Sequence, residues 1–388
     1  MESNNVTREE TENLDRHTVS TDEQHNALDN NQCNEQGSEN VESNEQCLEP
    51  GGEQDGPSRL RGYKIVCAKL GVAMCVYFLF RLLGGWIVLQ LGSHSNTMSE
   101  TIFSVLSSSV MIIFVYVIPL LITALLFNSF SNYRGKYRQL YAKPKRLARA
   151  MGTFPGTFGL GHGIALLTML IMYLITRNLS GHAYIEELLR PPVMEASTNF
   201  ASIFMLVFMM VIIAPLFEEF WVRGIMYDAL KPYGVGMAII ISSLLFGFMH
   251  GNIYMLFYTT AYGFAFGYIR YATNSLFTVT ILHAIVNSIG AGALVVTTLV
   301  QITNDENRLV NTFSWIYMLA FLAIIIIGVV IFLSKIPKIK KYRFENAWTE
   351  VGPWKKTALF FVSIPVILMM VLVFNELSHG LFVRLIFR

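Results

Sequence analysis

Long apolar runs, repeated along most of the chain, are the feature that most limits how these 388 residues fold. A helix needs roughly 20 apolar residues to cross the hydrocarbon core of a bilayer. Charged residues make up 14% of the chain, whereas a soluble domain carries about 25%. We therefore predict an all-α fold, a polytopic transmembrane helix bundle with about eight or nine spans. The runs lie near 66–90, 102–128, 157–176, 201–224, 237–256, 255–270, 276–300, 312–334 and 357–375.

Residues 1–58 differ in composition from everything that follows. They contain 15 Asp or Glu residues but only Arg8 and Arg16 as basic residues, and they are nearly free of aromatic side chains. Such a segment buries too little apolar surface to offset the entropy of ordering it. We predict a disordered acidic tail at 1–58 and a transmembrane domain at 59–388. The tail is either simply solvated or a docking arm for an unknown protein partner.

The loops indicate how the chain crosses the membrane. The segments "NYRGKYRQLYAKPKRLARA" and "SKIPKIKKYRFENAW" are strongly basic, and Lys and Arg concentrate in cytoplasmic loops. With nine spans and a cytoplasmic N-terminus, both segments fall on the cytoplasmic side. We therefore expect a multi-pass protein of the cell membrane. The N-terminus lacks the pattern of a cleavable signal peptide, and no cysteine pair has CxxC spacing.

Several ionisable or polar side chains lie within these apolar runs. Each costs a few kcal/mol at membrane depth, so each is by default a candidate for function. The candidates are Arg81, His162, Glu218, Glu219, Arg223, His250 and His283, with Asn287 as a polar companion.

Helical spacing separates the two adjacent glutamates. Glu219 and Arg223 are four residues apart, share a helix face and are expected to pair. Glu218 points about 100° away from that face. We therefore expect Glu219 to be neutralised by Arg223 and Glu218 to remain available as a general base.

The two histidines extend this arrangement. Phe246 lies one helical turn before His250, and Asn287 lies one turn after His283. At a rise of 1.5 Å per residue, Glu218, His250 and His283 lie ~18, ~22 and ~14 Å from the cytoplasmic ends of their helices. The three side chains are thus expected at a similar depth. Two other residues are interpreted as structural: Arg81, by pairing or snorkelling, and His162, by close packing in "GLGHG".

Three short motifs occur in order on separate apolar runs: "EEFWVR", "FGFMH" and "HAIVN". Their pattern, EExxxR, FxxxH and HxxxN, resembles the CPBP family of intramembrane proteases, which includes type II CAAX prenyl endopeptidases and bacteriocin-processing proteins. The resemblance covers about 200–295. It implies that Glu218 and His250 activate water, that His283 and Asn287 stabilise the oxyanion, and that Glu219 and Arg223 support the site. The similar segment "EELLR" at 186–190 is expected to lie in a loop between helices and is not interpreted as part of the site.

Alternatives remain open on chemistry and on function. No cofactor is expected, but Glu218, His250 and His283 are also a donor set that can bind zinc. The expected partners are the lipid bilayer and a membrane-associated peptide of prenylated or bacteriocin type, and no nucleic acid. A non-proteolytic membrane adaptor or immunity protein is the main alternative to an endopeptidase. A transporter with a proton relay is the other.

Overall fold

The computed structural model describes residues 56–93, 98–128, 147–178, 199–303, 307–339 and 350–378. The acidic tail up to residue 55 and the segment 186–190 were both subjects of predictions, and both lie outside this set. Most of the two basic loops also lies outside it, so the orientation in the membrane stays a prediction.

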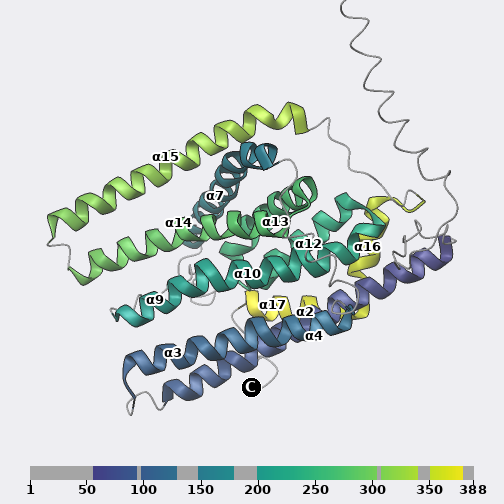
Figure 1. The fold of residues 1–388 in the computed structure, drawn as a ribbon, viewed down its shortest axis with the longest axis horizontal. Helices are drawn as coiled ribbons and strands as arrows, with labels where there is room; N and C mark the ends of the chain where they lie inside the picture. Colours follow the sequence, from purple (N-terminus) through teal and green to yellow (C-terminus); the bar gives the residue numbers. More distant parts are fainter. Residues whose placement is uncertain are drawn as a thin grey trace, which may run out of the picture. The chain divides into compact units, whose positions relative to one another are not determined.

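The described secondary structure is helical, and all nine apolar runs fall on helices (Figure 1). Two long segments each contain π-helical turns between α-helical parts. The elements are α2 (Gly56–Ser93), α3 (Glu100–Met111), η2 (Ile112–Val117), α4 (Ile118–Leu126), α7 (Leu147–Asn178), α9 (Phe200–Phe208), η3 (Met209–Ile213), α10 (Ala214–Glu219), η4 (Phe220–Met226), α11 (Tyr227–Leu230), η5 (Lys231–Tyr233), α12 (Val235–Met249), α13 (Ile253–Thr273), α14 (Leu276–Ile302), α15 (Arg308–Ile339), α16 (Pro353–Phe361) and α17 (Ile364–Leu377).

The prediction of an all-α, multi-pass membrane protein is confirmed. Six helices in the described ranges are long and apolar enough to cross a membrane, or seven if α16 and α17, which meet at a 70° bend, form one span. The count is slightly below the predicted eight or nine. One reason is that α12 has only 15 residues, since it ends at Met249 before a turn at Gly251.

Helix packing places α10 and α12 between other helices. α13 packs against both α12 and α7, and α14 packs against α10. α17 packs along α2, and α7 lies against α15 (Figure 1). The buried core includes apolar side chains from α2, η4, α12 and α13, among them Phe78, Ile225, Leu245 and Phe266. The segment that carries the two glutamates is therefore held from several sides.

Prolines explain where two of the π-helical turns lie. Pro119 and Pro215 are each the second residue of an α-helix that directly follows a π-helical turn. Proline has no N–H to donate, and its ring clashes with the carbonyl one turn earlier in a regular helix. A wider π turn relieves this conflict, and in a membrane it keeps the remaining backbone groups bonded. Both spans thus continue through their prolines.

Glycines allow α7 and α15 to cross closely. A Cβ atom added to Gly159 would lie 2.2 Å from the carbonyl carbon of Gly328, closer than two atoms can approach. One turn away, His162 Nδ1 lies 2.6 Å from the Tyr262 hydroxyl of α13. The expectation of close helix packing around "GLGHG" is confirmed, and His162 contributes to that packing.

Substitution at this crossing tests the fold. Gly159→Ala should destabilise the protein by about 1–3 kcal/mol, because two backbones must separate to admit one methyl group. Gly290→Ala is the matched control, since a Cβ there meets no heavy atom within 4 Å. Thermal unfolding in detergent, followed by Trp fluorescence, should show a lower midpoint for Gly159→Ala only. Equal midpoints for the two variants would contradict the close crossing.

Candidate active site

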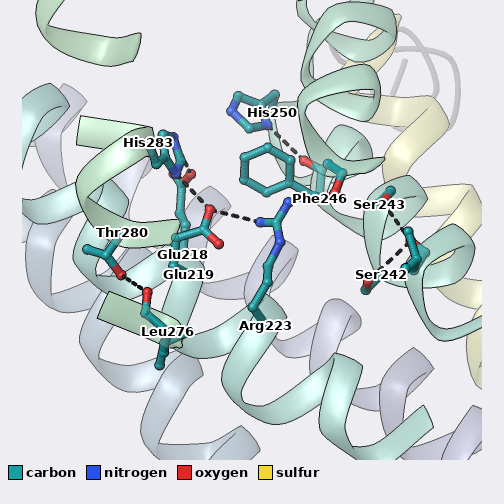
Figure 2. Close-up of polar contacts among 12 residues, drawn as sticks. Glu218, Glu219, Arg223, Ser242, Ser243, Phe246, His250, Leu276, Thr280 and His283 are labelled. Atoms are coloured by element: carbon teal, nitrogen blue, oxygen red, sulfur yellow. Dashed lines mark hydrogen bonds and ion pairs between the residues drawn. The ribbon is translucent and has the colours of Figure 1, made fainter. Parts of the chain in front are cut away.

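Three segments of the structure deliver the predicted site residues to one place (Figure 2). Glu218 and Glu219 end α10, and Arg223 follows in η4. Phe246 and His250 come from the end of α12, and His283 comes from α14. In Figure 2 the Arg223 side chain points to the glutamates, the Phe246 ring lies beside it, and His250 lies beyond that ring. The glutamates thus contact Arg223 and His283, and Phe246 contacts both His283 and His250.

Glu219 is fully buried and makes two strong contacts through one oxygen. Its Oε1 accepts hydrogen bonds from Arg223 Nη1 at 3.0 Å and from His283 Nδ1 at 2.8 Å. The predicted pair with Arg223 is therefore present. The bond to His283 was not predicted, because the two residues lie 64 positions apart and share no local spacing.

Arg223 is also fully buried, and its guanidinium has contacts besides Glu219, although its Nε has no hydrogen-bond partner among the described residues. Its Nη2 donates to the Gly263 carbonyl of α13 at 3.3 Å. Its guanidinium carbon lies 4.3 Å from the centre of the Phe246 ring and 5.6 Å from that of Phe266. These cation–π contacts and the ion pair stabilise a charge that would otherwise be costly to bury.

Glu218 has a different environment from its neighbour. Among the described residues, its one contact with a basic side chain at ion-pair range joins Oε2 to His283 Nε2, at 3.9 Å. That distance exceeds a direct hydrogen bond. Its side chain retains 11% exposure, whereas that of Glu219 has none. The expected asymmetry between the two carboxylates is present.

A tyrosine outside the predicted set also borders Glu218. Tyr116 of η2 interacts with the Glu218 side chain, and its ring centre lies 5.9 Å from that of Phe217. The sequence offered no signal for this contact, because Tyr116 belongs to a separate apolar run. A tyrosine hydroxyl is a hydrogen-bond donor that does not neutralise a carboxylate.

The hydrogen bonds fix which nitrogen of each histidine carries a proton. His250 Nδ1 lies 2.8 Å from the Phe246 carbonyl, which can only accept, so Nδ1 donates. His283 Nδ1 likewise donates to the Glu219 carboxylate. The rings of both histidines meet Phe246 edge to face, with centroids 5.0 Å away for His250 and 5.7 Å for His283. The second nitrogen, Nε2, of each ring is left for chemistry.

Asn287 makes a hydrogen bond to the backbone of another helical segment. Its Nδ2 donates to the Met210 carbonyl of η3 at 2.8 Å. This bond joins α14 to the π-helical turn that precedes the glutamates. Asn287 therefore has a structural contact in addition to the oxyanion role that the motif implies.

The donor set proposed for zinc does not form a compact group. Within the described parts of the chain, no three His, Cys, Asp or Glu side chains are arranged to hold a metal ion. Both glutamates lie within ion-pair range of His283. His250 instead packs against the Phe246 ring, which His283 also contacts. The protein's need for a metal stays a matter for experiment.

The comparison with known protein families matches this same region. Residues 200–289 fit the model of the type II CAAX prenyl endopeptidase Rce1-like family. The matched segment runs from the start of α9 into α14, and it contains every predicted site residue. No curated protein and no solved structure matched the chain. The match supports the resemblance of this region to the CPBP family of intramembrane proteases, on the same residues that carry the three motifs.

Proposed function

We propose that this protein cleaves a membrane-associated peptide with a water molecule activated by Glu218 and His250. The observation that carries the proposal is the asymmetry of the glutamates. Glu219 is held by Arg223 and His283, whereas Glu218 has no basic partner within hydrogen-bonding distance among the described residues. A carboxylate without a counter-ion, in a site shielded from solvent, is suited to accept a proton from water.

The gap between Glu218 and His283 suits a bridging oxygen. Oε2 and Nε2 lie 3.9 Å apart, which is too long for direct bonding and invites an intervening water or substrate atom. His250 Nε2 carries a lone pair, because its proton is on Nδ1. We propose that Glu218 accepts the proton of the attacking water and that His250 Nε2 accepts a hydrogen bond from the same water.

His283 and Asn287 are proposed to meet the negative charge on the carbonyl oxygen. Because His283 Nδ1 donates to Glu219, Nε2 donates to an oxyanion only when both ring nitrogens carry protons. The Asn287 amide has a second hydrogen besides the one used by Met210. Fixed donors of this kind stabilise the charge that develops during peptide hydrolysis.

The membrane setting defines the class of substrate. The site lies among helices that are long and apolar enough to cross a bilayer, and the matched family is described as type II CAAX prenyl endopeptidases. We propose a substrate whose cleaved peptide is anchored by a lipid or by an apolar segment, with prenylated and bacteriocin-type peptides as candidates. A cell-membrane location with a cytoplasmic N-terminus is part of the same proposal.

The first test compares two carboxylate variants. Glu218→Gln should reduce the cleavage rate by about 10²–10⁴-fold, because the general base is lost while shape is kept. The matched control is Glu350→Gln, which alters an exposed carboxylate away from the site and should cleave normally. Cleavage of a membrane-peptide library by purified protein in detergent, read by mass spectrometry, measures both.

Metal dependence is tested in the same assay. Cleavage that survives a chelator supports a metal-free glutamate mechanism. Loss with the chelator and recovery with zinc would move Glu218, His250 and His283 into the role of ligands. Full cleavage activity of Glu218→Gln would contradict its role as the general base, whereas absence of cleavage by well-folded wild type would favour the adaptor.

Variants at the two glutamate sites should also differ in thermal stability. Arg223→Met leaves Glu219 buried with its ion-pair partner missing, at a cost of about 3–5 kcal/mol. Glu218→Gln, in contrast, should leave the thermal midpoint close to that of wild type. Adding Glu219→Gln to Arg223→Met should recover part of the loss, since the unpaired charge is removed. A thermal midpoint for Arg223→Met equal to that of wild type would show that the pair does not hold the site together.

A further inference from the structure

The end of α12, one residue before His250, is held by side chains from α2. The Met249 carbonyl accepts a hydrogen bond from Tyr77 Oη at 3.0 Å and another from Arg81 Nη1 at 2.9 Å. Arg81 Nη1 also lies 3.3 Å from the Tyr77 hydroxyl. Carbonyls in the last turn of a helix have no partner within that helix, and none is supplied by lipid. Tyr77 and Arg81 satisfy this one.

A second helix holds Arg81 in turn. Its Nε lies 3.7 Å from Glu376 Oε2 in the last turn of α17. The chain reverses directly against this pair at Gly251, whose φ of +61° is a conformation that glycine adopts without strain. A Cβ there would lie 3.2 Å from Arg81 Nη2 and 3.3 Å from Glu376 Oε2. The turn after His250 therefore packs directly against the ion pair of Arg81 and Glu376.

The ring of His250 depends on that same last turn of α12. Its Nδ1 donates to the Phe246 carbonyl, and its ring lies edge to face with Phe246. Both anchors belong to the helix that Arg81 and Tyr77 hold. If the end of α12 loosens, the Nδ1 bond and the direction of Nε2 change together.

We propose that Arg81, held by Glu376, is a positioning residue that sets the direction of His250 Nε2. The proposal rests on the proposed function, because His250 takes part in catalysis only there. Arg81 and Glu376 both lie outside residues 200–289, so helices beyond the matched family region complete the site. The sequence indicates a structural role for Arg81, and the proposal adds to this a role in orienting His250.

Kinetics provide the first arm of the test. Arg81→Gln should lower kcat by up to about 10²-fold, the effect of a misplaced group, with little change in KM. Arg81→Lys should recover much of the rate, since an ammonium group can still donate to Met249. Tyr77→Phe keeps the packing and removes one of the two donors, so it should give a smaller loss. The exposed Glu350→Gln variant again serves as the control.

The second arm reads His250 directly and needs no substrate. Ring ¹⁵N NMR of histidine-labelled protein in detergent, assigned with His250→Asn, should show the Nδ1–H form of His250 in wild type. In Arg81→Gln and in Glu376→Gln the His250 signal should shift towards a mixture of the two tautomers. His283 is the internal control, because its Nδ1 is bonded to Glu219.

The two arms separate the two proposals. A changed His250 signal together with a reduced kcat supports the positioning role. An unchanged His250 signal in Arg81→Gln, Glu376→Gln and Tyr77→Phe overturns that role, whatever the activity. A changed signal with an unaltered kcat keeps the orienting contact and overturns the catalytic role of His250 in the proposed function. If wild type cleaves nothing, the NMR arm still decides whether Arg81 orients the ring.

Discussion

The buried contact between Glu219 and Arg223 is the interaction on which the rest of this structure depends. Removing two charges from water costs several kcal/mol per ion unless each finds good partners. The partners come from four helical segments: α10, η4, α13 and α14. These contacts stabilise the two charges and also fix the relative positions of the segments. Because Phe246 also packs on Arg223, the end of α12 that carries His250 is tied to the same centre.

Helical geometry lets two identical side chains, adjacent in sequence, take different roles. Glu219 faces the arginine and a histidine, and it is sealed from solvent. Glu218 faces a different direction and keeps a small exposure. One carboxylate thus supplies the fixed charge around which the helices assemble. The other has no part in that ion pair, so the proposed role in proton transfer does not compete with the assembly of the helices.

Features set by local spacing could be predicted from the sequence, whereas those set by packing could not. The pair of Glu219 with Arg223 follows from one helical turn, and the turn at Gly251 follows from its composition. The bond from His283 to Glu219 joins distant parts of the chain, so no spacing predicts it. Tyr116 and Arg81 belong to other apolar runs, so no local spacing predicts that they lie near the site. The π turn η3 shifts the helical register, and Asn287 bonds to its backbone.

The packing of α17 along α2 has a consequence for how the protein is made. Glu376 follows Arg81 and all of α12 in the sequence, so the ion pair between α2 and α17 forms only after α12 has been synthesised. Until then Tyr77 and Arg81 can bond to the end of α12 without the carboxylate that holds Arg81. The surroundings of His250 are therefore completed by the last described helix, after every residue of the three motifs has been synthesised.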